Sequence, residues 1–349
     1  MKHSLLKHSN VAIFVPHNGC PHCCSFCNQV KITGQQKQPT ADDVINAASV
    51  AMKSKRYNTQ QSEIAFFGGS FTAIDRSYMV MLLSAAYQYV KNDSFAGIRI
   101  STRPDYIDNE ILEILKSYGV TAIELGAQSM CDDVLTANMR GHTAKDVANA
   151  SKLIKEYGFS LGLQMMTGLY KSSIEKDIYT AEQICSLSPD TVRIYPTIIM
   201  ADTVLADYYK NGDYNTYPLE ETVELCAKLL QMFNKQGIRV IRLGLHSTED
   251  ISKGMVAGPW HPSLGELCAA RVFRNSIDDY IKANALPAGC YTVAVNSRDI
   301  SKVLGQKHSN IEYFAQKGYS LTVKQGNVVQ GEFYFSDLTD KQNTCFNKS

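Results

Sequence analysis

Short runs of β-branched and aromatic residues alternate with longer amphipathic stretches from Val11 to about Leu245. The runs have the composition of buried strands, and the stretches between them repeat apolar positions at helical spacing. Several helical stretches end in glycine just before the next strand, as helix C-caps commonly do. The predicted strands are VAIFV (11–15), EIAFFGG (63–69), GIRIST (97–102), TAIELG (121–126), SLGLQMM (160–166), TVRIYP (191–196) and IRVIRLGL (238–245).

This alternation, at a spacing of roughly 30 residues, predicts an α/β fold with a parallel sheet. The absence of a phosphate-binding glycine fingerprint favours a partial (β/α)6-type TIM-like barrel over a doubly wound sheet. In a barrel of this kind the functional side chains lie at the carboxyl ends of the strands.

The pattern changes after Leu245, where a Gly/Pro-rich segment and a long helical stretch follow. Residues 290–335 then have the pattern of a strand, two short helices and two strands, which predicts a small α+β C-terminal region. The last residues are polar, as frayed chain ends often are. The predicted division is a barrel domain over 1–245, a C-terminal lid or α+β region over 246–335, and a frayed tail over 336–349.

The composition is that of a globular protein without a strong overall charge. Of the 349 residues 44% are hydrophobic, and 35 Lys and Arg against 34 Asp and Glu give a net charge of +1. This balance excludes a whole-chain field that would attract nucleic acid or a membrane. Without an apolar run of membrane-spanning length or a signal-peptide core, we expect a cytoplasmic protein. Its ten cysteines then need an explanation other than disulfides.

Four of those cysteines lie within eight residues, in Cys20-Pro-His-Cys23-Cys24-Ser-Phe-Cys27. Paired CxxC units are compatible with a structural zinc ion. A redox CxxC is a second reading, although it normally accompanies a thioredoxin-like fold. In the third reading Cys20, Cys24 and Cys27 bind three irons of a 4Fe–4S cluster and leave the fourth iron open. An open metal position is what chemistry requires, so the third reading is favoured.

The spacing of the cysteines resembles that of the radical S-adenosylmethionine (SAM) superfamily. Its pattern Cys-x3-Cys-x2-Cys carries an aromatic residue before the last cysteine, where this chain has Phe26. The next signature of the superfamily is a glycine pair that ends the second strand, matched by Gly68 and Gly69. Glycines at this place let the backbone closely approach the amino group of SAM.

Further segments resemble the radical SAM domain of the Elongator catalytic-subunit family. The match keeps its order and spacing over about residues 8–245, and similar bacterial stand-alone proteins carry this domain without the acetyltransferase half. The matching segments are 101–106, 124–129, 140–143, 165–169 and 193–197.

The resemblance implies a 4Fe–4S cluster and SAM as cofactors. Cys20, Cys24 and Cys27 would hold the cluster, and Cys23 would be a bystander. A one-electron donor such as flavodoxin or ferredoxin would reduce the cluster. The other residues implied to bind or face SAM are Phe26, Gly68, Gly69, Ser101, Gln128, Arg140, Gln164 and Tyr195.

Several of these assignments compete with structural roles. Gln128 and Arg140 match positions that meet the SAM ribose and carboxylate, but a strand-end or capping hydrogen bond is the alternative for each. Ser101 stands where relatives carry Glu, which weakens or shifts that contact. Gln164 resembles a SAM-facing position, and Tyr195 either approaches the adenine or packs beneath it.

Polar residues near these segments also have two readings. Arg103, Asp105 and Tyr106 either contact substrate or form a local network in which Arg103 pairs with Asp105, and the local network is favoured. For His142 a loop hydrogen bond is favoured over a proton shuttle.

Two features lie beyond the last barrel strand. His246, Trp260-His261-Pro262 and Glu266 either form a lid over the open face or serve domain packing. The stretch 301–311 resembles the helix–loop–helix of a KH domain, whose GxxG loop clamps a nucleotide backbone. Here His308 replaces the second glycine.

The leading prediction is a radical SAM enzyme that cleaves SAM reductively and generates a 5′-deoxyadenosyl radical, which abstracts hydrogen from an unidentified substrate. Elongator-type relatives modify the wobble uridine of tRNA, which makes tRNA a candidate substrate. Only about 100 residues follow the barrel, too few for the acetyltransferase domain of those relatives. The alternatives are radical chemistry on a small molecule or peptide, and a nucleic-acid-binding protein with a structural metal cluster.

Overall fold

The structure is a computed structural model, and it describes residues 8–16, 24–28, 37–55, 57–245, 253–337 and 345–346. The chain divides into two compact units. The first comprises Met1–Tyr217 and Ile238–Pro259, and the second comprises Pro218–Gly237 and Trp260–Ser349. The division into 1–245, 246–335 and 336–349 stays a prediction, while the compact units assign Pro218–Gly237 to the C-terminal part.

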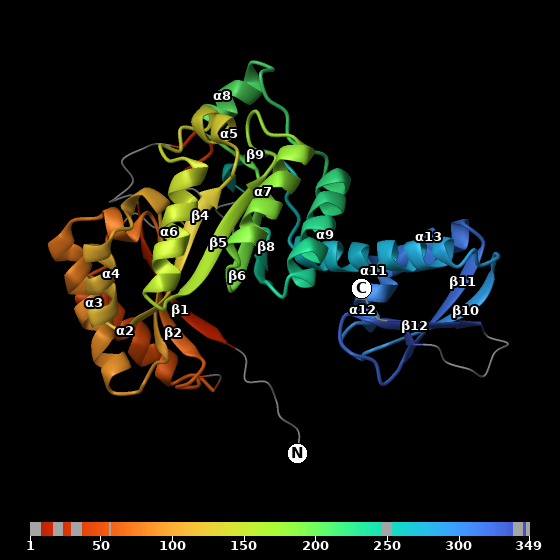
Figure 1. The fold of residues 1–349 in the computed structure, drawn as a ribbon, viewed down its shortest axis with the longest axis horizontal. Helices are drawn as coiled ribbons and strands as arrows, with labels where there is room; N and C mark the ends of the chain where they lie inside the picture. The colour runs from red at the N-terminus through yellow and green to blue at the C-terminus, as the bar shows by residue number, and fades with distance from the viewer. Residues whose placement is uncertain are drawn as a thin grey trace. The chain divides into compact units, whose positions relative to one another are not determined.

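A seven-stranded parallel sheet forms the centre of the first unit, in the order β1-β2-β3-β4-β5-β6-β8. The sheet curls into a half-barrel whose edge strands are β1 and β8 (Figure 1). The strands are β1 (Ser9–Val15), β2 (Ser62–Gly68), β3 (Gly97–Thr102), β4 (Val120–Gln128), β5 (Ser160–Thr167), β6 (Thr191–Pro196) and β8 (Arg239–Leu243).

Helices follow most of these strands, and the longer ones lie along the outer face of the half-barrel (Figure 1). Most begin at a capping side chain: the Thr143 hydroxyl, for example, accepts from the backbone N–H of Asp146, whose carboxylate accepts from the Thr143 N–H. The helices are α2 (Ala41–Met52), α3 (Arg76–Lys91), α4 (Asn109–Ser117), α5 (Asp132–Ala137), α6 (Ala144–Glu156), α7 (Ile174–Leu187) and α8 (Val204–Lys210), with short 3₁₀ turns η1 (Phe71–Ala73) and η2 (Pro104–Tyr106). A two-stranded ribbon pairs β7 (Ile199–Met200) with β9 (Met255–Ala257).

Alternation along the strands separates an apolar outer face from a polar inner face. On β3, Ile98 and Ile100 are fully buried, whereas the alternate residues Arg99 and Ser101 bond to side chains of other strands. On β4, Ile123 likewise belongs to the apolar outer face, whereas Glu124 lies on the inner face and bonds to Arg193. Successive strand residues point to opposite faces, so the polar residues converge inside the half-barrel.

The predicted α/β class and the partial barrel are confirmed, with β8 as a seventh strand. The strands lie within a few residues of the predicted ranges; β4 extends to Gln128 at its carboxyl end. No helix in the described part of the chain is long and apolar enough to cross a membrane.

The second unit is the small α+β region that the sequence predicts. Its four-stranded sheet has the order β11-β10-β12-β13, with β10 parallel to β11 and antiparallel to β12. Val293, Val295 and Phe314 are among the buried residues of its core. The elements are α9 (Leu219–Lys235), α11 (Leu264–Ala283), β10 (Gly289–Val295), α12 (Ile300–Leu304), η3 (Gln306–His308), α13 (Ser309–Gln316), β11 (Tyr319–Gln325), β12 (Phe333–Asp337) and β13 (Cys345–Phe346).

Candidate functional site

Residues 24–28 form a short segment that hydrogen bonds hold to two neighbouring elements. The Ser25 N–H donates to the Asn138 carbonyl at 3.2 Å, and the Ser25 hydroxyl donates to Asn138 Oδ1 at 2.8 Å. The Leu205 N–H at the start of α8 donates to the Ser25 carbonyl at 2.8 Å. The segment is therefore fixed both to the end of α5 and to α8.

Two of the three predicted cluster ligands lie in this segment. The Cys27 N–H donates to the Cys24 carbonyl at 3.1 Å, which closes a turn, and both cysteines are partly exposed. Phe26 between them packs against an apolar cluster that includes Leu205. Cys20, the third predicted ligand, lies outside the described residues, as does Cys23.

Arg140 connects this segment to β4. Its Nη1 donates to Cys24 Sγ at 3.1 Å, and its Nη2 donates to the Gly126 carbonyl at 2.6 Å. The residue is only 6% exposed. A metal-bound thiolate accepts hydrogen bonds, so a guanidinium donor is a suitable neighbour for a cysteine that ligates a metal.

Gln128 ends β4 beside Arg140, in a left-handed conformation (φ +66°) after a bulge. A Cβ on Gly126 would lie 3.0 Å from Gln128 Nε2 and 3.3 Å from Arg140 Nη2, so both polar groups close over this glycine. Gln128 Oε1 and Arg140 Nε are buried and have no hydrogen-bond partner among the described residues. Orphaned buried polar atoms are rare, and two adjacent ones indicate a place that a ligand completes.

His142 lies in the same loop and makes the predicted loop hydrogen bond, with its Nε2 donating to the Ala127 carbonyl at 3.2 Å. Its Nδ1 is buried without a partner in the described part of the chain. Burial, together with the nearby charge of Arg140, lowers the pKa of His142 to about 4. The imidazole is therefore neutral near pH 7.

Arg103 and Asp105 form the predicted pair, and Arg103 also contacts the loop that carries Arg140 and His142. The Arg103 Nε and Nη2 donate to the two Asp105 carboxylate oxygens, each at 2.9 Å. Nη2 also donates to the Arg140 carbonyl. Arg103 thus holds the backbone of Arg140 in place.

The glycine pair at the end of β2 allows a close backbone approach. Gly68 has φ +115°, and a Cβ there would lie 2.8 Å from the Val15 carbonyl oxygen. That oxygen accepts from the Gly69 N–H at 2.9 Å. Any side chain at Gly68 would push the carboxyl ends of β1 and β2 apart.

Three buried hydroxyls that the sequence analysis did not single out connect β2 to β3. Thr102 Oγ1 lies 2.9 Å from Ser70 Oγ and 2.6 Å from Thr72 Oγ1. The Thr72 hydroxyl also donates to the Tyr106 carbonyl at 2.7 Å. Isolated serines and threonines have no sequence pattern that distinguishes such a network from surface residues.

Ser101 and Gln164 contact each other inside the half-barrel, together with Glu124. Gln164 Nε2 donates to Ser101 Oγ at 3.5 Å and to Glu124 Oε2 at 3.2 Å. The strand register places Glu124 directly beside Ser101. A carboxylate therefore lies next to the position where Ser101 departs from the family pattern, although it belongs to the neighbouring strand.

Ion pairs connect the strands on the inner face of the half-barrel next to Gln164. Glu124 accepts from Arg193 through two bonds of 2.6 and 2.9 Å and from Arg99 at 3.4 Å. Arg99 also donates to Glu63 at 2.8 Å, which His8 approaches at the same distance. Burial would raise the pKa of Glu63, but the bonds from His8 and Arg99 outweigh it and hold the pKa at about 2.

Tyr195 stands at the end of β6 above this network. Its hydroxyl lies 3.5 Å from Arg193 Nη1, and the Arg193 guanidinium lies 5.1 Å from the centre of the Phe67 ring. The contact of Tyr195 with adenine stays a prediction.

Two family models match this chain: "Radical SAM superfamily" over residues 14–183 and "Radical_SAM C-terminal domain" over 189–274. Together they cover well over half of the 349 residues. The chain belongs to the radical SAM superfamily of enzymes. Superfamily membership implies SAM and an iron–sulfur cluster as cofactors.

Curated relatives of this radical SAM chain include two proteins named for tRNA modification or for Elongator. A tRNA uridine(34) acetyltransferase of Dehalococcoides mccartyi is 27% identical over 60% of this chain and 52% of its own length. Elongator complex protein 3 of Homo sapiens is 31% identical over 63% of this chain and 43% of its own length. This chain thus spans about half the length of these relatives.

The solved structure of the archaeal Methanocaldococcus infernus Elp3 superimposes with a TM-score of 0.62 at 22% identity, covering 81% of this chain and 64% of the other. At this identity the likeness supports the fold alone. The half-barrel is therefore the radical SAM fold.

The residues at the carboxyl end of β4 fit what a radical SAM site has to hold. A thiol with a guanidinium 3.1 Å away suits a metal-bound thiolate, and the orphaned atoms of Gln128 and Arg140 offer an acceptor and a donor to a polar ligand. Within the described residues no cluster of three metal-ligating side chains is complete, since Cys20 falls outside them.

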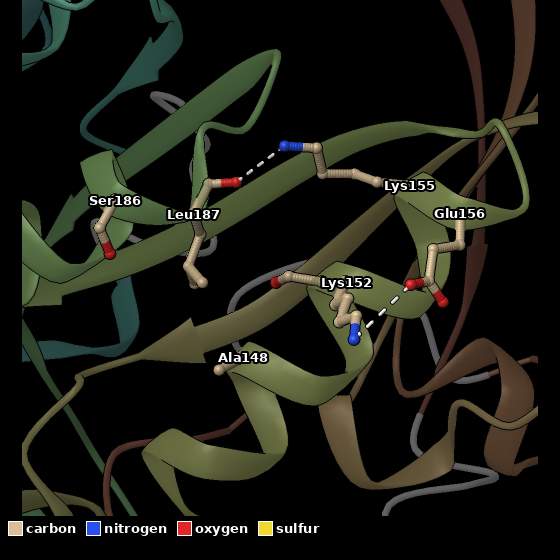
Figure 2. Close-up of a pocket in the computed structure, with 7 residues that line it drawn as sticks. Ala148, Lys152, Lys155, Glu156, Ser186 and Leu187 are labelled. Carbon is tan, nitrogen blue, oxygen red and sulfur yellow. Dashed lines mark hydrogen bonds and ion pairs between the residues drawn. The ribbon is translucent and has the colours of Figure 1, made fainter.

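A cavity of about 410 Å³ on the outer side of the radical SAM domain, between α6 and α7, is a separate feature (Figure 2). Lys155 Nζ donates to the carbonyls of Leu187 and Ser188 at the end of α7, and Lys152 pairs with Glu156 at 3.7 Å. Lysines commonly cap the last carbonyls of a helix in this way. These side chains serve the helices rather than the half-barrel interior.

The predicted C-terminal features lie in the second unit or outside the described residues. His261 Nδ1 accepts from the Ser263 N–H at 3.1 Å, which marks the start of α11, and His246 is not among the described residues. In the GxxG-like loop Gly305, Lys307 and His308 all have positive φ, at +75°, +53° and +63°. His308 thus adopts a conformation that favours glycine.

Proposed function

We propose that this chain is a radical SAM enzyme of the cytoplasm, with a 4Fe–4S cluster held by Cys20, Cys24 and Cys27. A flavodoxin or ferredoxin would serve as the one-electron donor. When bound, the cluster supplies the electron that cleaves SAM to methionine and a 5′-deoxyadenosyl radical, which abstracts hydrogen from the substrate.

The single observation that carries this proposal is the bridge made by Arg140. Its guanidinium reaches both the Cys24 sulfur and the end of β4, where Gln128 Oε1 and Arg140 Nε are buried without partners. A structural metal site would need the thiolates alone and would leave these atoms unexplained. A polar cofactor lying between the cysteines and β4 gives each of them a partner.

The residues of this chain would orient SAM and keep water away. Gln128 and Arg140 would contact its ribose and carboxylate, and the backbone at Gly68 and Gly69 its amino group. Phe26, partly buried against the cluster that includes Leu205, would shield the cysteine turn. The remaining SAM-facing residues in this proposal are Ser101, Gln164 and Tyr195.

We propose tRNA as the substrate. The relatives named tRNA uridine(34) acetyltransferase and Elongator complex protein 3 support this choice. The loop from Gly305 to His308 lies between two short helices and turns through the left-handed residues Lys307 and His308, which makes it a candidate contact for a nucleotide backbone. Because the chain spans only about half of those relatives, acetyl transfer is not part of the proposal.

The test is anaerobic reconstitution with iron and sulfide, reduction with dithionite, and chromatographic measurement of 5′-deoxyadenosine in the presence of SAM. Wild type should form it, and Cys24→Ala should not. The matched control is Cys185→Ala, because the Cys185 thiol lies on α7, where burial raises its pKa. If wild type forms no product, or Cys24→Ala forms as much, the proposal is wrong.

The substrate is tested by adding purified tRNA to the same assay. Intact tRNA should raise the rate of 5′-deoxyadenosine formation, while nuclease-digested tRNA should leave it unchanged. Equal rates with both would argue for radical chemistry on a small molecule or peptide.

A further inference from the structure

A cavity of about 220 Å³ lies inside the half-barrel and is bounded by both edge strands. It differs from the outer cavity of Figure 2 in lying on the polar inner face of the sheet. Its polar lining consists of His8, Asn10, Arg99, Arg193, Arg239 and Arg242.

Two of the four arginines are neutralised by carboxylates. Arg99 pairs with Glu63 at 2.8 Å and with Glu124 at 3.4 Å, and Arg193 pairs with Glu124 at 2.6 Å. These four residues form a closed network in which every charge has an opposite neighbour.

The other two arginines, on β8, have no such partner. Arg242 donates through Nε to the Gly244 carbonyl at 3.0 Å, and Arg239 is exposed. Among the described residues no carboxylate forms an ion pair with either guanidinium. Burial lowers the pKa of Arg242; Tyr195 opposes this to a smaller extent, and the nearby Arg193 adds a still smaller lowering. Counting the described residues alone, four guanidiniums against two carboxylates give the cavity a surplus of two positive charges.

We propose that this cavity binds a phosphate group of the substrate, held by Arg239 and Arg242. The inference rests on the proposed function, because it identifies the chemistry of the substrate that enters the same half-barrel. The planar guanidinium matches phosphate oxygens with paired hydrogen bonds. A phosphate monoester carries about −1.5 to −2 charges at neutral pH, close to the surplus in the cavity.

The arrangement differs from that of ordinary surface arginines. Arg242 is half-buried beside Arg193, so its charge is partly removed from water, and no carboxylate of the described residues neutralises it. Such a charge is costly unless a counter-charge arrives. In the outer cavity, by contrast, the Lys155 ammonium group donates hydrogen bonds to two carbonyls at the end of α7.

The first experiment titrates inorganic phosphate into the full-length protein carrying its reconstituted cluster, at constant ionic strength maintained with chloride. Wild type should bind phosphate, and Arg242→Gln and Arg239→Gln should each bind it roughly tenfold or more weakly, since each loses a charged hydrogen-bond donor. Arg76→Gln is the matched control, because Arg76 is an exposed arginine on α3 that pairs with Glu110. Its affinity should equal that of wild type.

The second experiment identifies the source of the phosphate group. Uridine 5′-monophosphate and a short single-stranded RNA without terminal phosphate are titrated into the same proteins. Loss of binding in Arg242→Gln for the monophosphate assigns a phosphate monoester, and loss for the RNA assigns a phosphodiester backbone. Equal affinities of wild type and both variants for all three probes, or no binding by wild type, would overturn the inference.

These titrations need neither SAM nor reductant. A failure to bind phosphate therefore leaves the proposed SAM cleavage standing. A failure to form 5′-deoxyadenosine likewise leaves the phosphate site standing as a property of the half-barrel.

Discussion

The buried polar groups in the middle of strand β4 have hydrogen-bond partners, whereas some of those at its carboxyl end have none among the described residues. Glu124, in the middle, is 1% exposed, and its carboxylate accepts from Arg193, Arg99 and Gln164. At the carboxyl end, Gln128 and Arg140 keep buried atoms that have no partner in the described structure. A region whose polar groups are all paired contributes to the stability of the fold, whereas a region that leaves them unpaired is prepared for a ligand.

The largest effect on stability is expected in the middle of the strand. Glu124→Gln removes the charge that neutralises Arg193 and should lower the free energy of unfolding by about 3–5 kcal/mol. Chemical denaturation measures this change. The matched control is Glu110→Gln, whose exposed pair with Arg76 is worth at most about 1 kcal/mol. If both variants lost a similar free energy of unfolding, the buried network would contribute no more to stability than the surface pair.

The carboxyl end should show the reverse, with an effect on activity rather than on stability. Arg140→Gln loses a charged donor to the Cys24 sulfur and should reduce 5′-deoxyadenosine formation roughly 10- to 100-fold. The assay is run at equal iron content, with thermal unfolding measured in parallel. A variant that unfolds early but retains its turnover would place Arg140 with the structural residues.

His142, which lies at the carboxyl end of β4, should make the stability of the protein depend on pH. Its pKa is about 4 in the folded protein and about 6.5 when unfolded, so the unfolded state binds more protons between these values. Stability should therefore fall as pH falls through that window, by about 2 kcal/mol from pH 7 to pH 5 for this residue alone.

The variant His142→Gln keeps a donor for the Ala127 carbonyl and has no titrating group. The difference in unfolding free energy between wild type and variant should change across pH 7 to 5, which isolates this residue from all other titrations. A difference that stays constant would mean that His142 titrates normally.

The smallest effect is expected at the glycine pair. Gly68→Ala adds a Cβ at 2.8 Å from the Val15 oxygen at φ +115°, whereas Gly212→Ala adds one at φ +82° with nothing within 4 Å. Both should cost about 1 kcal/mol in backbone strain, and Gly68→Ala should cost roughly 1 kcal/mol more. Thermal unfolding of the two variants compares them directly, and equal shifts would show that the close approach at Gly68 does not matter.

Much of the half-barrel is predictable because its strands are buried on their outer face and spaced by helices. The run TVRIYP, for example, coincides with β6 from Thr191 to Pro196. Helix α9, by contrast, has the same amphipathic pattern as the barrel helices, yet it belongs to the second compact unit. An apolar stripe specifies that a helix is buried and leaves its partner open.

The candidate site was predictable only where residues form a motif. Cys24, Gly68 and Gln128 stand in recognisable patterns, whereas the Ser70–Thr102 hydroxyls do not. Arg239 and Arg242 carried a signal, since arginines inside the apolar run IRVIRLGL are unusual for a buried strand. That signal specifies a charge in the barrel, and only the structure reveals that no carboxylate of the described residues pairs with it.

The most direct test of this account is the affinity of the cluster-loaded protein for SAM, measured by anaerobic equilibrium dialysis with labelled SAM. The comparison is between wild type and Gln128→Leu, which removes the orphaned amide from the end of β4. The account predicts that wild type binds SAM and that the variant binds it at least about tenfold more weakly, with the same iron content and melting temperature. Equal binding by the two proteins, or no binding by wild type, would contradict the claim that the unpaired end of β4 is the cofactor site.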